Sequence, residues 1–108
     1  MTVFESLQGI NAYPVPTRSL VTMLTKRGLT PEETVTQDTL EDMRFNLARA
    51  DVLFWLSMAP NVSQGGQSYS FTEEQRSRLR QEAMDLYGQW EPESDVNKSI
   101  YGYKGDTL

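Results

Sequence analysis

Only carboxylates, hydroxyls, lysine and tyrosine are left in this chain as side chains that could carry out chemistry. The 108-residue sequence contains no cysteine and no histidine, which excludes disulfides, thiolate or imidazole metal sites, a catalytic cysteine and a Ser-His-Asp triad. Carboxylates do occur as neighbours, in the pairs Glu32/Glu33, Glu41/Asp42 and Glu73/Glu74. Neighbouring residues of a helix point in different directions, so no pair converges on one substrate atom. The sequence therefore predicts no catalytic, cofactor-binding or metal-binding residues and no enzyme activity.

Asp51 is the one acid set in hydrophobic sequence, between Ala50 and Val52. If it were buried, the pKa of its carboxyl group would rise and it would need a basic partner from another helix. If it lay at the edge of the apolar face, it would pair with an arginine or lysine at the surface. We favour the second interpretation. An enzyme built around Asp51 would instead require a pocket with a perturbed carboxylate.

Arg76, Arg78 and Arg80 form the only basic cluster. On a helix, Arg76 and Arg80 share a face that could contact an anion or an acidic partner. Glu73, Glu74 and Glu82 flank these arginines. The net charge of −5 argues against a general phosphate-backbone binder. A regulatory or nucleic-acid-associated binding module using this cluster is the alternative interpretation of the sequence. The main interpretation, given below, expects no nucleic acid.

Residues 38–59 are predicted to form a central helix. Asp38 and Glu41 have the spacing of a capping box, and Pro60 sets the end. One hydrophobic stripe is expected to form the core seam, and it comprises Leu40, Met43, Leu47, Ala50, Phe54 and Met58. From Val52 to Ala59 the helix is apolar nearly all round, which is typical of a segment buried on most sides. We expect this segment to be where the core of one chain gives way to an interface, with Trp55 as the deciding residue.

Capping signals predict three further helices. These are residues 3–10 with a Thr2/Glu5 capping box, residues 16–27 ending at Gly28, and residues 73–87 with a Thr72/Gln75 box and Gly88 as the stop. Residues 30–37 are expected to form a turn or loop. For residues 61–71 either a flexible loop or a short hairpin turning at Gly65-Gly66 is possible. The prediction is an all-α fold, a bundle of three to four helices in a domain of residues 1–88, followed by a C-terminal arm, residues 89–108.

The arm is unusually rich in apolar and aromatic residues for a solvated tail. We expect it to lie along its own domain or along a neighbouring subunit. Together with the central helix and the 61–71 segment it supplies the residues predicted for an interface, namely Trp55, Gln64, Gly65, Gly66, Tyr69, Trp90, Ile100, Tyr101 and Tyr103.

The run LARADVLFWLSMAPNVSQGGQSYSFTEEQR, residues 47–76, resembles small proteins of Bacteroidetes phages and prophages. These proteins are similar to the small helical head-tail connector, or head-completion, proteins of tailed phages. The resemblance covers roughly residues 4–90 in layout, and it carries over no functional residues. It implies a helical, non-enzymatic subunit that assembles into rings between portal and tail.

The main functional expectation is therefore a structural assembly protein of a phage or prophage particle. Its expected partners are itself and phage portal or tail proteins, with no small-molecule substrate and no membrane. The N-terminus has neither a basic region nor a long apolar segment, so we expect no secretory signal. We expect the protein in the cytoplasm of the bacterial host and in the virion.

Overall fold

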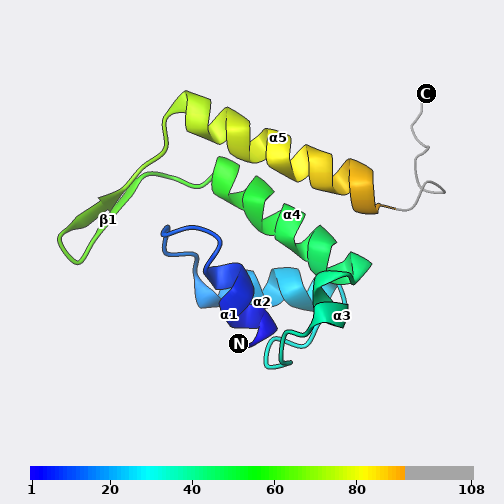
Figure 1. Ribbon diagram of the computed structural model, residues 1–108. Helices are drawn as coiled ribbons and strands as arrows, with labels where there is room; N and C mark the ends of the chain where they lie inside the picture. Colours follow the sequence, from blue (N-terminus) through cyan, green and yellow to red (C-terminus); the bar gives the residue numbers. More distant parts are fainter. Residues whose placement is uncertain (92–108) are drawn as a thin grey trace.

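The computed structural model describes residues 1–91, which fold into three layers (Figure 1). Helix α4 (Met43–Ser57) forms the middle layer. Helices α1 (Val3–Gln8) and α2 (Thr17–Lys26) cover one side of it, and α5 (Glu73–Trp90) covers the other. A short helix α3 (Gln37–Leu40) precedes α4, and strands β1 (Val62–Gln64) and β2 (Gln67–Tyr69) form one antiparallel pair. The described chain is thus mostly helical, as predicted, and the 61–71 segment is a hairpin.

The predicted start and stop signals explain most of the helix ends. Both halves of the capping box are present at Thr2 with Glu5 and at Thr72 with Gln75. At the end of α2, Gly28 has a φ of 81°. The amide of Leu29 donates to the carbonyl of Leu24 at 3.0 Å, which is the long-range hydrogen bond of a Schellman motif. Glycine is required at residue 28 because that backbone conformation is strained for other residues.

The predicted single helix over residues 38–59 is wrong, because the chain turns between α3 and α4. Thr36, not Asp38, caps α3 and pairs with Thr39. Asp42 caps α4, and its Oδ1 atom accepts the amide of Arg44 at 2.7 Å. Aspartate competes well for an N-cap position because its side chain satisfies a free amide there. The helix therefore begins again at residue 43.

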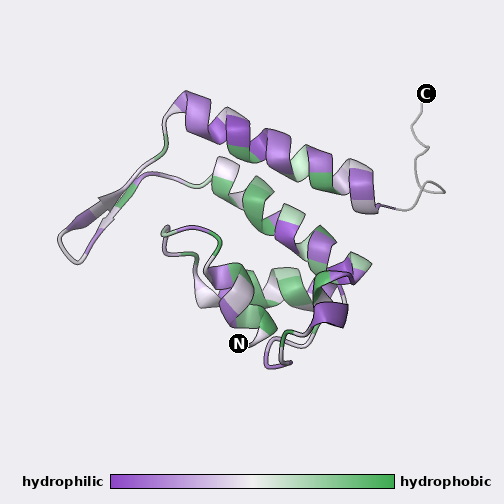
Figure 2. Ribbon diagram, in the orientation of Figure 1, coloured by the Kyte–Doolittle hydropathy of each residue, from purple (hydrophilic) through white to green (hydrophobic). Residues whose placement is uncertain are grey.

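The predicted core seam of the central helix is only partly correct. Leu47 and Ala50 are buried, but Leu40, Met43 and Met58 are 47%, 41% and 61% exposed. Helix α4 is covered from two sides, so it buries residues around most of its circumference rather than one stripe. Figure 2 shows the contrast with α5, which is largely hydrophilic. The prediction that the second half of this helix is buried on most sides is confirmed, by Val52, Leu53, Leu56 and Ser57.

Helix α5 continues through Gly88, where we predicted its end, to Trp90. Gly88 is not among the glycines with positive φ, so it takes no part in a left-handed cap. The amide of Glu91 still bonds to the carbonyl of Tyr87 at 2.9 Å. The predicted boundary between domain and arm at residue 88 consequently falls inside a helix.

Candidate interaction surface

The β-hairpin stands out from the helical body at the junction of α4 and α5 (Figure 1). Its strands pair Val62 with Tyr69 and Gln64 with Gln67. Gly65 and Gly66 form the two-residue turn, with φ of 58° and 79°. Positive φ at both central residues is the signature of a type I′ turn, whose twist matches that of paired strands. Every residue from Ser63 to Ser68 is exposed.

Asn61 and Arg76 hold the base of the hairpin. Oδ1 of Asn61 accepts the amide of Phe71 at 3.2 Å and Nη2 of Arg76 at 2.9 Å. Nη1 of Arg76 donates to the carbonyls of Ser57 at 3.2 Å and Ala59 at 2.6 Å. These carbonyls belong to the end of α4, where backbone acceptors lack helical partners. One side chain from α5 thus fastens both ends of the hairpin to the end of α4.

Aromatic side chains pack beside this hydrogen-bonded base. The ring of Tyr13 stacks on Phe71 with centroids 5.6 Å apart, and it meets Trp55 and Tyr69 edge-on at 5.9 and 6.3 Å. The hydroxyl of Tyr13 donates to the carbonyl of Pro60 at 2.5 Å. The guanidinium of Arg76 lies 5.5 Å from the centre of the Phe71 ring. The base is therefore held by hydrogen bonds and packed rings, whereas within the described chain no hydrogen bond joins residues 63–68 to the helical body.

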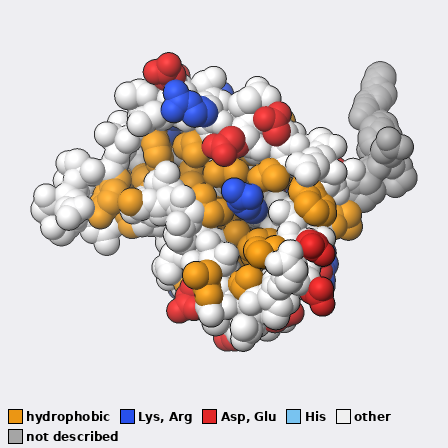
Figure 3. Space-filling model, viewed as in Figure 1, with side chains coloured by type: hydrophobic (Ala, Val, Ile, Leu, Met, Phe, Trp, Pro, Cys, Tyr) orange, Lys and Arg blue, Asp and Glu red, His pale blue; other side chains and the backbone are white. Residues whose placement is uncertain are grey.

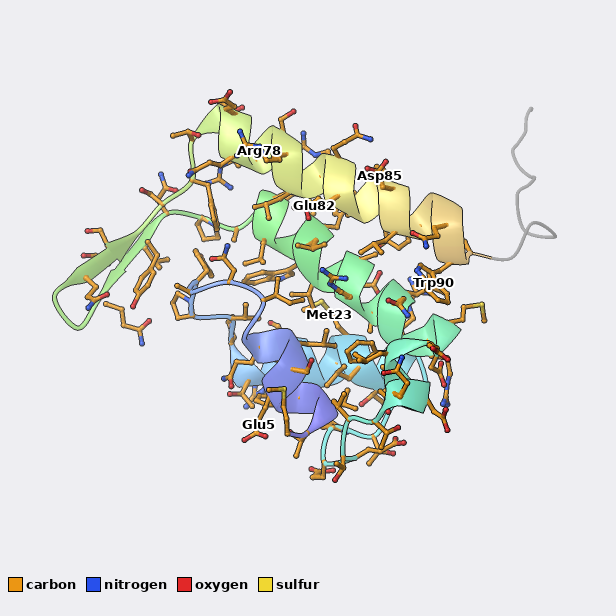
Figure 4. The ribbon with its side chains drawn as sticks, viewed as in Figure 1. Glu5, Met23, Arg78, Glu82, Asp85 and Trp90 are labelled. Carbon is orange, nitrogen blue, oxygen red and sulfur yellow. The ribbon has the colours of Figure 1, made fainter. Side chains whose placement is uncertain are left out.

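The residues predicted for an interface do not form one surface. Gln64, Gly65 and Gly66 lie exposed at the tip, while Trp55 and Tyr69 are half-buried at the base. Trp55 packs against Tyr13 of the same chain, so the intramolecular core takes up part of its surface. Trp90 lies at the other end of α5 (Figure 4). The predicted contacts Ile100, Tyr101 and Tyr103 lie outside the described residues.

The three arginines of the predicted basic cluster do not share one environment. Arg76 turns inward, with its side chain only 16% exposed. Arg78 and Arg80 are exposed, and Nη2 of Arg78 lies 3.9 Å from Glu74. Figure 4 shows Arg78 on the same helix as Glu82 and Asp85, which carry the opposite charge. The cluster therefore offers two exposed arginines rather than three.

Asp51 forms the ion pair that we expected, with Arg27 as its partner. Nε and Nη2 of Arg27 donate to the two carboxylate oxygens at 2.7 and 2.9 Å. The hydroxyl of Tyr87 also donates to Asp51. Burial, followed by this hydrogen bond, raises the pKa of Tyr87. Asp51 belongs to α4, Tyr87 to α5, and Arg27 caps the end of α2, so the group ties all three layers together.

The two stretches of chain that form the hairpin end of the molecule contain no charged residue. Residues 52–72 and 6–17 contain no Asp, Glu, Lys or Arg, and the contacts of Tyr13 bring these two stretches together. Figure 3 shows the result, with only hydrophobic and neutral atoms on the projecting hairpin while acidic and basic groups dot the body. We call this end, residues 10–16 with residues 60–71, the neutral end.

Sequence reasoning missed two residues of this surface, Tyr13 and Asn61. Neither belongs to a periodic stripe or a capping box, so no spacing rule identifies it. A tyrosine just before a proline and an asparagine just after one are weak signals, which acquire meaning only from the contacts between elements distant in sequence.

Comparison with known proteins gives a family but no function. No helix within residues 1–91 is long and apolar enough to cross a membrane, and the same residues hold no group of acids that could bind a metal ion. No curated protein and no solved structure matches the chain. One family model does match, that of the family of unknown function DUF6706, over residues 1–101. The chain therefore belongs to DUF6706, a family of unknown function.

Proposed function

We propose that this chain is a structural assembly protein of a phage or prophage particle, of the head-tail connector kind. It acts by binding other copies of itself and portal or tail proteins, in the host cytoplasm and then in the virion. No step of this role requires a catalytic residue, a cofactor or a metal. The resemblance of residues 47–76 to small phage proteins supports the class of particle.

The observation that carries the proposal is a hairpin whose base is held by hydrogen bonds to the helical body and whose tip is exposed. An isolated two-stranded ribbon is marginally stable in water, yet here Arg76, Asn61 and Tyr13 are committed to holding one outward. An exposed segment held in a fixed direction favours recognition by another protein, because little conformational entropy remains to be lost on binding. A surface for a small molecule would instead be concave and largely apolar.

The test is made in a lysogen that carries this sequence. Gln64→Glu with Gln67→Glu places two charges on the exposed tip without touching the packed base. The matched control, Gln8→Glu with Gln89→Glu, adds the same charge at exposed positions of α1 and α5. After induction we expect the tip variant to give particles arrested between head and tail, and the control to give complete particles. Electron microscopy and plaque counts provide the measurement.

Mass spectrometry of purified particles gives a second readout, because a structural subunit must copurify with them. Deletion of the gene should arrest assembly at the same stage as the tip variant. Normal yields of infectious particles after deletion, with the protein absent from purified particles, would refute the proposed function.

A further inference from the structure

Both outer edges of the hairpin are open for pairing. In a hairpin with a two-residue turn the flanking pair, Gln64 with Gln67, exchanges the ladder hydrogen bonds, and the next pair points its backbone groups outward. That pair is Ser63 with Ser68. Neither residue forms a hydrogen bond to another element within the described chain. Each strand therefore presents one free N–H and one free C=O at its edge.

The hairpin lacks the devices that normally protect such edges. Natural edge strands are blunted by lysines, inward-pointing charges, prolines or bulges. Residues 62–69 contain no charged residue and no proline, and their register shows no bulge. Unprotected edges are templates for adding a strand.

A slot lies beside the outer edge of β2. It is a hollow of about 190 Å³, bounded by residues 11–13 on one side and residues 68–71 on the other. All of its lining residues are uncharged. An added strand would lie about 4.8 Å from β2, which places it in this slot. No residue of β1 lines this hollow, so it lies on the β2 side of the hairpin and makes β2 the receiving edge.

We propose that strand β1 of one copy of this chain enters the slot beside β2 of the next copy, pairing Ser63 of one with Ser68 of the other. This inference rests on the proposed function and names the partner at the hairpin. A second copy is favoured by charge. Each copy carries a net charge of −5, so identical bodies repel each other, and the neutral end is where they approach without that cost.

The pairing is head to tail, since one copy contributes β1 and the other contributes β2. Strands added in this way alternate in direction, with all hairpin tips pointing the same way. A heterologous contact of this kind closes into a ring when the rotation between copies permits it. Closure leaves no edge unpaired.

A single contact of this type is weak, because three-residue strands supply few hydrogen bonds. The test therefore traps the contact at high protein concentration, and it uses the absence of cysteine in the chain. Ser63→Cys and Ser68→Cys are prepared as separate proteins, mixed and mildly oxidised. We expect a disulfide between the two variants, severalfold above the level in a mixture of Ser63→Cys with Ser77→Cys, whose cysteine lies exposed on α5. Peptide mapping identifies the linked residues.

A further variant probes the slot itself. Ala12 is exposed and lines the slot, so Ala12→Glu in the Ser68→Cys protein should reduce the mixed disulfide to the control level. Circular dichroism of each variant checks that the fold is retained. A mixed yield equal to the Ser77 control would overturn the proposal. So would linkage of Ser63→Cys to itself at the level of the mixture, which indicates a symmetric contact between two β1 edges.

The two proposals fail in different ways. If the mixed disulfide stays at the control level while deletion still arrests particle assembly, the assignment of the partner is wrong and the assembly role stands. If deletion leaves assembly intact, the proposed function is wrong whatever the disulfide yield.

Discussion

Replacing Arg76 with alanine tests whether this residue fastens the hairpin to the helical body. The substitution removes three hydrogen bonds, to the carbonyls of Ser57 and Ala59 and to Oδ1 of Asn61. It also uncovers the ring of Phe71. A hydrogen bond from a charged donor contributes about 1.5–3 kcal/mol to stability. The three contributions do not add, because truncation lets water reach the freed acceptors. We expect the free energy of unfolding to fall by about 2–3 kcal/mol.

Urea denaturation followed by tryptophan fluorescence measures this loss, and Arg80→Ala is the matched control. Arg80 is exposed on the same helix, so its replacement should change stability by no more than about 0.5 kcal/mol. Amide exchange adds a local readout. In Arg76→Ala we expect the amides of residues 62–69 to exchange faster relative to those of α4. Equal stabilities of the two variants, with unchanged exchange in the hairpin, would refute the role assigned to Arg76.

Four further substitutions are tested by urea denaturation. Gly88→Ala should raise the free energy of unfolding by about 0.5–1 kcal/mol, because Gly88 lies in a helix with open space around it. Gly28→Ala should lower it by about 1–2 kcal/mol, because the φ of 81° is strained for alanine. Thr72→Ala removes the capping box of α5 and should cost about 1 kcal/mol. Tyr87→Phe should change the pH dependence of stability. The raised pKa of Tyr87 means that the unfolded chain releases this proton near pH 10, before the folded chain does. Wild-type stability therefore falls as the pH rises above about 10, and the variant should show a shallower fall in urea midpoints measured across that pH.

The parts of the fold predicted correctly are those that depend on local chemistry. The capping boxes at Thr2 and Thr72 and the end of α2 at Gly28 each act through hydrogen bonds or φ angles within a few residues. For Gly65 and Gly66 the hairpin was one of two open alternatives, and their positive φ angles decide for it. The break before α4 was missed because two local signals competed. Asp38 with Glu41 matched a capping box by spacing, but Thr36 and Asp42 capped the helices instead.

The parts that were missed depend on contacts between distant segments. Arg76 has the sequence surroundings of a solvated helix residue, and only the end of α4, reached through the hairpin, supplies the carbonyls that draw it inward. A single-stripe prediction for α4 failed for a related reason. Periodicity identifies an apolar face, but it does not say that a second layer covers the opposite face of the same helix.

A small buried side chain between α5 and α4 affects the direction in which the hairpin points. Ala83 in α5 is fully buried, in the core cluster that also holds Val52 and Leu56 of α4, and a residue this small lets two helices approach closely. The hairpin connects the two helices. Its first strand follows the end of α4, and Arg76 of α5 donates a hydrogen bond to the carbonyl of Ala59 just before that strand. A larger residue at position 83 would spread the helices and swing the tip through an arc that grows with distance from the base. A substitution in the core can thus change the direction of the hairpin tip without changing any residue that a partner would contact.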